Sequence, residues 1–295
     1  MMGAKMIDLG EASKVELVLE SSYTSRDVAL YALGVGAGSD PLDDSDRRFV
    51  YERGEFHALP TFAVIPQSNA MLSTITPTGF NLPGMSASLE CLLHGEQYTE
   101  LRAPLPTSAK LKHLVRFKNA YDKAPNAVVE YGITSVDESG RQIMYNEISF
   151  FVIGGGGWGG DRGPSAPAVS PPDRAPDAVI EEKTAPNQAL LYRLSGDWNP
   201  LHADPAFARR FGFDRPILHG LCTFGYLGRH VMKAMFGNDP HKFKSIKVRF
   251  AEPVFPGETL VSRMWREGDT RVIAETIVKE RGKAAIKNGV IESRD

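Results

Sequence analysis

Residues 192–202 read Tyr-Arg-Leu-Ser-Gly-Asp-Trp-Asn-Pro-Leu-His, and they decide how the second half of the chain is interpreted. Asn199-Pro200 cannot continue a helix, because the residue before a proline is pushed toward extended geometry and proline donates no N–H. We therefore expect Asp197, Asn199 and His202 on a turn-rich loop, where their side chains can converge on one small target. A carboxylate and an imidazole that share one water form a general acid/base pair.

Residues 216–225 read Pro-Ile-Leu-His-Gly-Leu-Cys-Thr-Phe-Gly, and an apolar helical pattern begins at Leu218 with Gly220 in its first turn. Free N–H groups at a helix start stabilise developing negative charge, and a glycine lets a carbonyl approach the backbone closely. The combination suits chemistry beside a carbonyl, such as adding water to a conjugated thioester. From the residues alone, Asp197 and His202 could equally be a local cap and a surface residue.

The two stretches 192–202 and 216–225 together resemble the signature of the hydratase 2 family, the MaoC-like (R)-specific enoyl-CoA hydratases. The resemblance implies reversible syn addition of water to a trans-2-enoyl-CoA, giving a (3R)-3-hydroxyacyl-CoA, in fatty-acid β-oxidation. It implies that Asp197 and His202 activate the water, that Asn199 helps to position it, and that the N–H of Gly220 binds the thioester oxygen. Which of Asp197 and His202 moves which proton stays open.

The resemblance also implies a set of residues that bind the acyl-CoA substrate. They are His94, Gly95, Lys123, Trp198, Pro200, Leu201 and Phe250. No cofactor is implied, because coenzyme A is part of the substrate. From the residues alone, His94-Gly95 could be a turn at a strand end, Lys123 a solvated loop lysine, and Phe250 a core residue at a strand end.

Composition limits the class of protein. The chain has 295 residues, of which 42% are apolar, enough for one large or two ordinary domains. A net charge of -2 argues against a nucleic-acid partner, and no stretch approaches the roughly 18 apolar residues of a membrane span. Cys91 and Cys222 lie in apolar sequence, which is typical of reduced core cysteines in an intracellular protein.

A Gly- and Pro-rich stretch divides the chain into two parts. We expect an N-terminal unit at 1–153, a linker at 154–178 and a C-terminal catalytic unit at 179–295. Few apolar residues in the stretch could offset the entropy of ordering it, so it should cross the surface as a linker. A phosphate-binding glycine loop is the alternative, but no Gly-Lys-Ser/Thr and helix follow it.

The expected elements of the two units follow a similar order. The first unit should contain a short helix ending at Gly34, an apolar run at 60–66, no clear long helix, and strands at 85–93, 97–103, 110–121, 127–136 and 142–153. The second should contain helices at 187–194, 206–211 and 218–236, and strands at 242–250, 258–265, 271–279 and 284–291.

This order predicts an α+β tandem hot-dog fold, in which each antiparallel sheet wraps a helix and the first repeat is degenerate. The first half lacks the Asp/Asn/His set, so only the second copy should keep the chemistry. Gly225 and Gly228 weaken an isolated helix, and tight packing of the helix against the sheet is the expected reason for them.

Other functions remain open beside the hydratase. An acyl-CoA thioesterase or a carrier-protein dehydratase can use the same fold, and a non-catalytic acyl-CoA-binding subunit would need neither Asp197 nor His202. The spacing of His, Cys and carboxylate residues predicts no metal site. The resemblance implies a homodimer and a peroxisomal location, although the last residues, Glu-Ser-Arg-Asp, are not a Ser-Lys-Leu signal. Without the resemblance, a cytoplasmic location would be expected.

Overall fold

In a computed structural model, which describes residues 7–10, 12–76, 79–164 and 169–294, ten strands form one antiparallel sheet. Five strands come from the first half: β1 (Glu16–Tyr23), β5 (Leu92–Leu101), β6 (Ala109–Lys123), β7 (Asn126–Asp137) and β8 (Gln142–Val152). Five come from the second: β9 (Ala178–Lys183), β10 (Phe243–Phe250), β11 (Thr259–Glu267), β12 (Arg271–Val278) and β13 (Lys283–Ser293).

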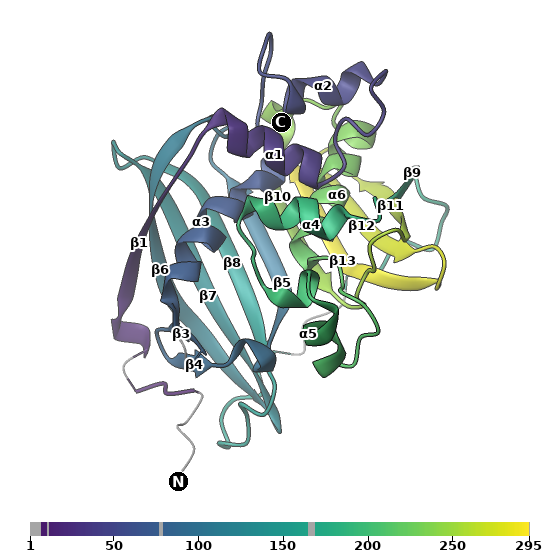
Figure 1. The fold of residues 1–295 in the computed structure, drawn as a ribbon. Helices are drawn as coiled ribbons and strands as arrows, with labels where there is room; N and C mark the ends of the chain where they lie inside the picture. The colour runs from purple at the N-terminus through teal and green to yellow at the C-terminus, as the bar shows by residue number, and fades with distance from the viewer. Residues whose placement is uncertain (1–6, 11, 77–78, 165–168, 295) are drawn as a thin grey trace.

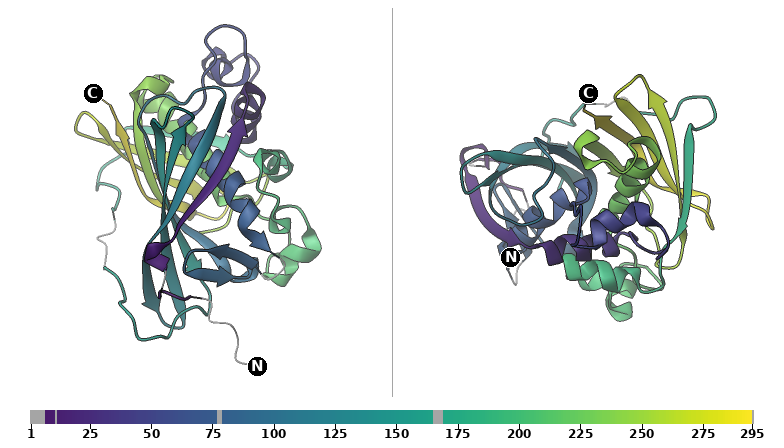
Figure 2. Two further views of the ribbon diagram at one scale, coloured as in Figure 1. Left: turned by 90° about the vertical axis from the view of Figure 1, so that its left-hand side faces the viewer. Right: turned by 90° about the horizontal axis from the view of Figure 1, so that it is seen from above.

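The two halves meet along one strand pair. The strand order is β1-β6-β7-β8-β5-β10-β13-β12-β11-β9, so the pairing of β5 with β10 joins the two five-stranded parts into a continuous sheet (Figure 1). Seen from above in Figure 2, the sheet curves around α3 (Val64–Met71) in the first half and around α6 (Gly220–Met235) in the second. Each half is therefore a sheet wrapped around a helix, as the sequence predicts.

Three further helices lie on the same side of the sheet as α3 and α6: α1 (Ser25–Gly34), α4 (Gln188–Tyr192) and α5 (Pro205–Arg210) (Figure 1). A fourth, α2 (Asp44–Val50), stands beyond the upper ends of the strands. A carboxylate oxygen of Asp27 accepts the N–H of Thr24 at 2.8 Å and so caps the start of α1. The helix ends at Gly34 as expected. Within the described part of the chain, no helix has the length and apolar character needed to cross a membrane.

The first half contains a helical segment that the sequence pattern did not reveal. The apolar run at 60–66 begins a 3-10 turn (Pro60–Ala63), which continues into α3 and then into a second turn at Leu72–Thr74. Pro66 lies in the first turn of α3, where its missing N–H removes no intrahelical hydrogen bond. The proline therefore does not stop the helix, although in the sequence it resembles a boundary.

The strands expected at 85–93 and 97–103 are also arranged differently. Met85–Ala87 is β4, the last strand of a small meander with β2 (Ile75–Thr76) and β3 (Gly79–Leu82), and a 3-10 turn separates it from β5. β5 then runs without a break through Leu92–Leu101. The expectation of two strands was wrong because residues 94–96 form a β-bulge inside one strand, where the register with β8 shifts.

The prediction that Gly225 and Gly228 pack against the sheet is wrong. A Cβ added to Gly225 would lie 2.4 Å from Cγ1 of Val35, and one added to Gly228 would lie 2.3 Å from Cγ2 of Thr61. Val35 directly follows α1 and Thr61 lies in the segment before α3, so both neighbours come from the first half. The two glycines therefore let the central helix of the second half lie directly against the first half, which fixes how the two halves meet.

A buried ionic cluster joins the halves at the far end of α6. The guanidinium of Arg229, which is 2% exposed, donates to the carboxylate of Asp46 in α2 at 3.0 Å and also to Glu182 in β9. His230 lies beside the same Glu182 carboxylate. Paired in this way, the buried charges avoid the cost of an uncompensated ion.

The Gly-rich stretch is held to the first half rather than loosely tethered. The carboxylate of Asp122 at the tip of the β6–β7 hairpin accepts the N–H groups of Gly157, Gly159 and Gly160 at 2.8, 2.7 and 3.3 Å. These hydrogen bonds offset part of the entropy lost when the Gly-rich stretch becomes ordered, because the stretch has few apolar residues to bury. The described residues between β8 and β9 contain no helix or strand, and the domain limits proposed from the sequence stay a prediction.

Candidate active site

A cavity of about 1110 Å³ lies where the two halves meet, and residues of both halves line it. The segment between α4 and α5 forms part of its wall and crosses the junction of the halves (Figure 1). Around this cavity the structure places every site residue expected from the sequence: Asp197, Asn199, His202, Gly220, His94, Gly95, Lys123, Trp198, Pro200, Leu201 and Phe250.

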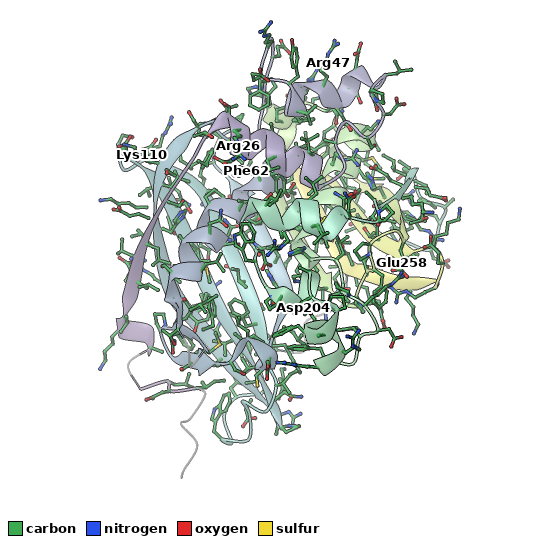
Figure 3. All side chains as sticks on the ribbon, viewed as in Figure 1. Arg26, Arg47, Phe62, Lys110, Asp204 and Glu258 are labelled. Carbon is green, nitrogen blue, oxygen red and sulfur yellow. The ribbon has the colours of Figure 1, made fainter. Side chains whose placement is uncertain are left out.

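Local hydrogen bonds shape the loop that carries the polar residues. Gly196 adopts φ +132°, a conformation that L side chains rarely take, and so turns the chain directly before Asp197. The side-chain oxygen of Asn199 accepts the N–H of Leu201 at 3.0 Å and caps the short turn Pro200–His202. Asp204, labelled in Figure 3, then caps α5, because its side chain accepts the N–H groups of Ala206 and Phe207.

Asp197 and His202 both present their polar atoms to the cavity. Oδ1 of Asp197 accepts the N–H of Asn199 at 3.1 Å, which orients the half-buried carboxylate. His202 is 8% exposed, and its Nδ1 donates to the carbonyl of Ile217 at 2.9 Å. This bond assigns the proton to Nδ1 and leaves Nε2 as an acceptor.

Burial lowers the pKa of His202, and the negative charge of Asp197 opposes that shift only in part. The ring is therefore neutral at neutral pH, and its free Nε2 can accept a proton. A neutral imidazole beside a carboxylate is the arrangement that a general base requires.

His219 supports this pair from behind. Its ring stacks on that of His202, with centroids 3.7 Å apart and planes at 27°, and its Nε2 donates to the backbone carbonyl of Asp197 at 3.2 Å. Burial lowers the pKa of His219 well below its usual value. These contacts favour a role for His219 in orienting the loop rather than in carrying a proton.

The same three residues lie closer together than the sequence spacing indicates. Ligand-type atoms of Asp197, His202 and His219 all lie within 4.8 Å of one another. However, each ring already donates one N–H to a backbone carbonyl, so each has one nitrogen lone pair left. Because the two rings are stacked nearly parallel, these two lone pairs lie in nearly parallel planes. Tetrahedral metal coordination needs lone pairs that converge, so the arrangement favours acid/base chemistry.

Gly220 is the first residue of α6, a position whose backbone N–H has no acceptor within the helix. A Cβ at this position would lie 3.3 Å from Cδ1 of Phe250, so the ring of Phe250 packs directly against the helix start. Phe250 also contacts the ring of His94, with centroids 5.0 Å apart. Glycine therefore leaves the narrow space that a thioester carbonyl needs to reach the N–H.

His94 and Gly95 lie at the bulge inside β5, which corrects the alternative of a turn at a strand end. Burial lowers the pKa of His94 to about 4, and its Nε2 has no hydrogen-bond partner among the described residues. Lys123 is the last residue of β6, not a loop lysine, and its Nζ donates to the carbonyl of Arg162. Trp198 lies at the rim, 51% exposed, with the guanidinium of Arg193 4.2 Å from its ring centroid.

Some residues that line the cavity were not expected from the sequence. Lys247 and Arg249 line the cavity from exposed positions of β10, and Arg249 forms no ion pair among the described residues. Their alternation with the buried Ile246 and Val248 was the available signal. From the first half, α3 contributes Asn69, which could not be foreseen because α3 itself was missed.

Both halves contribute apolar residues to the cavity, and those of the first half form one region of it. The walls of this region include Ile65 and Leu72 of the α3 segment, Phe80 of β3 and Phe150 of β8. The cavity thus has an apolar region in the first half, basic residues on β10 and β6, and the Asp197–His202 pair on the loop from the second half.

Family models match both halves of the chain. Residues 21–154 match the MFE-2 hydratase 2 N-terminal domain, and residues 167–289 match the MaoC-like domain. The chain is 46% identical over 276 residues to peroxisomal multifunctional enzyme type 2 of Mus musculus, covering 92% of this chain and 36% of that protein. It therefore spans about a third of that relative. It is 44% identical to the peroxisomal enoyl-CoA hydratase 2 of Arabidopsis thaliana, covering 90% of this chain and 88% of the relative.

Solved structures agree with these matches. A MaoC-like dehydratase from Phytophthora capsici superposes with a TM-score of 0.86 at 34% identity, covering 98% of this chain and 99% of that one. A Mycobacterium tuberculosis protein described as a double hotdog fold superposes with a TM-score of 0.56 at 14% identity, covering 94% of this chain and 95% of that one, which supports the fold alone. The predicted tandem hot-dog fold is confirmed, and the chain belongs to the hydratase 2 family of MaoC-like proteins.

Proposed function

We propose that the protein is an (R)-specific 2-enoyl-CoA hydratase, which adds water reversibly to a trans-2-enoyl-CoA and forms a (3R)-3-hydroxyacyl-CoA. One observation carries the proposal: a carboxylate, an imidazole whose Nε2 is free to accept a proton, and the first residue of a helix line one cavity. Membership of the hydratase 2 family points to the same reaction.

The geometry supports a simple sequence of proton movements. A water between Asp197 and His202 donates one proton to Nε2 of His202 while its oxygen attacks C3 of the enoyl group. Asp197 accepts the second water proton in a hydrogen bond, which orients the water, and its charge stabilises the imidazolium that forms. The imidazolium then gives its proton to C2 on the same face, which makes the addition syn and regenerates the neutral ring.

Negative charge develops on the thioester oxygen during this attack. The N–H of Gly220, with the dipole of α6 behind it, is placed to stabilise that charge. One such donor is typically worth about 3–4 kcal/mol of transition-state stabilisation. The acyl chain would occupy the apolar part of the cavity beside Ile65, Leu72 and Phe80. A cavity of about 1110 Å³ leaves room for a medium or long acyl chain.

The coenzyme A phosphates need cations, because the net charge of the chain offers no general attraction. Lys123, Lys247 and Arg249 line the same cavity, and Arg249 has no competing ion pair among the described residues. A guanidinium binds phosphate with two parallel hydrogen bonds. We therefore assign Arg249 to the phosphate end of the substrate, beside the sequence-derived Lys123.

The first experiment follows the loss of enoyl-thioester absorbance of trans-2-decenoyl-CoA, with chiral analysis of the product. We expect (3R)-3-hydroxydecanoyl-CoA, and a severe loss of its formation in Asp197→Asn. The hydratase proposal would be wrong if the protein consumed no enoyl-CoA with an acyl chain of about four to sixteen carbons. This range spans short to long chains, whose apolar transfer energy rises with each methylene. Release of free thiol would then separate a thioesterase from a binding subunit.

We further propose that the protein is a homodimer that acts in the peroxisome. The relatives from mouse and Arabidopsis carry the word peroxisomal in their names, and β1 and β9 are the two edge strands at which another chain could add to the sheet. Light scattering of the purified protein tests the dimer, and imaging of a tagged full-length protein in its own cells tests the compartment.

A further inference from the structure

A residue of the first half contacts the loop that carries Asp197. The side-chain amide of Asn69, in α3, donates through Nδ2 to the backbone carbonyl of Ser195 at 3.0 Å. A Cβ added to Gly196 would lie 1.6 Å from Oδ1 of the same amide. The Asn69 side chain therefore lies against the two residues that directly precede the carboxylate.

Few other polar contacts hold this part of the loop. In the described chain, two hydrogen bonds connect residues 195–197 to elements beyond the loop and its flanking turn: the bond from Asn69 and the bond from His219 to the carbonyl of Asp197. One comes from each half of the protein. The carboxylate is thus positioned between a donor from α3 and a donor at the start of α6.

Two cavities border this part of the loop. Asn69 and Trp198 line both the main cavity and a second cavity of about 360 Å³, Asp197 lines the main one, and Ser195 and Gly196 line the second. Ser195 is 8% exposed and packs toward α1, so packing fixes part of its position. Gly196 and Asp197 are half-buried, and directional hydrogen bonds to their neighbours help to set where the carboxylate lies.

We propose that Asn69 is a positioning residue for hydration: it holds Ser195 and Gly196 so that the carboxylate of Asp197 faces His202 and the reacting water. The inference rests on the proposed hydratase activity and adds to it a catalytic task for the first half. That half then does more than make room for the acyl chain, because its helix α3 sets the geometry of a proton-transfer site formed by the second half.

Steady-state kinetics of Asn69→Ala on trans-2-decenoyl-CoA test the proposal. A small misplacement of a reacting group costs up to about 100-fold in rate, so we expect kcat to fall about 10- to 100-fold while KM changes by less than about two-fold. Asn69→Asp keeps the shape but removes the donor, and the same loss of kcat is expected. The matched control is Ser73→Ala on the following turn. Ser73 is exposed, and among the described residues its Oγ bonds only to the carbonyl of Ala70.

A double substitution separates positioning from general damage to the fold. If Asn69 acts through Asp197, then Asn69→Ala should lower the residual activity of Asp197→Asn by less than about two-fold, far less than it lowers the wild type. A full additive loss in the double variant would overturn the proposal. An increase in KM with unchanged kcat would also overturn it, since Asn69 would then only contact the acyl chain.

Hydrogen exchange gives a readout that does not depend on activity. Amides of residues 195–199 should exchange faster in Asn69→Ala and Asn69→Asp than in the wild type or Ser73→Ala, while amides of α6 keep their protection. Unchanged exchange of the loop would refute the positioning role even if activity fell. If the wild type hydrates no enoyl-CoA but the loop still loses protection, the proposed reaction fails and the contact of Asn69 with the loop stands.

Discussion

His202 meets the substrate as a neutral ring, because burial disfavours its cation and the Ile217 carbonyl holds the Nδ1 proton. Activity therefore requires the deprotonated form, and kcat/KM should fall as the pH drops through the pKa of His202 in the folded protein. That pKa lies below the ordinary value of about 6.5. The acid limb of the pH–rate profile should accordingly lie below pH 6.5.

The charge of Asp197 opposes the effect of burial, so its removal has a predictable direction. In Asp197→Asn the pKa of His202 should fall further, and the acid limb of the residual activity should move to lower pH. We also expect kcat to fall by about 100- to 10,000-fold, because the water loses the acceptor that orients it and the imidazolium loses its counter-charge. A limb that stays in place, measured from pH 4 to 8, would mean that the two side chains do not interact.

At the level of single elements, the close approach of α6 to the first half makes a strong prediction for Gly228. Alanine is the better helix former by about 1 kcal/mol, yet its Cβ would lie 2.3 Å from Cγ2 of Thr61. Gly228→Ala should therefore destabilise the protein by about 1–3 kcal/mol, as overpacked cores do. Chemical denaturation monitored by circular dichroism measures the change.

A second substitution provides the control. Thr61→Ser removes the methyl group that the new Cβ would meet, so Gly228→Ala combined with Thr61→Ser should recover most of the stability lost in the single variant. If Gly228→Ala alone were stabilising, the crossing of α6 over the first half would differ from the one described.

The sequence predicts elements well where local signals agree. Asp204-Pro205 starts α5, and α6 ends before Gly237 and Asn238, which adopt φ 63° and 57°. The missed features depend on context instead. Pro66 resembles a helix stop but occupies a first turn that tolerates proline, and the bulge at Gly95 is visible only once β5 pairs with β8.

The candidate site shows the same division. Asp197, Asn199 and His202 are close in sequence, so the residues and their resemblance to hydratase 2 were sufficient to propose them. Asn69 and the stacking of His219 on His202 depend on how distant segments meet, and no short-range pattern encodes that. The partners of Gly225 and Gly228 were misjudged for the same reason, since they come from the other half.

Across the whole molecule, the buried cluster around Arg229 connects α6 with α2 and β9. Arg229→Met would leave the carboxylates of Asp46 and Glu182 buried without a cation, and such a change typically costs about 3–5 kcal/mol. We expect a loss of that size in urea denaturation, whereas Arg47→Met, which breaks only an exposed pair with Asp44, should cost less than about 1 kcal/mol. Equal effects of the two variants would show that the cluster contributes no more than a surface ion pair.

The seam between β5 and β10 has a consequence for how such a protein can be encoded. Five residues of β5, Glu96–Glu100, pair with β10, and contacts between α6 and the first half add to this interface. These contacts hold the halves together independently of the peptide chain that connects them. A chain cut between the exposed residues Ser170 and Pro171 should therefore yield two polypeptides that reassemble when co-expressed. Each alone should be inactive, because α3 and the Asp197 loop belong to different pieces. One gene could then be replaced by two, with the strand seam acting as the subunit interface.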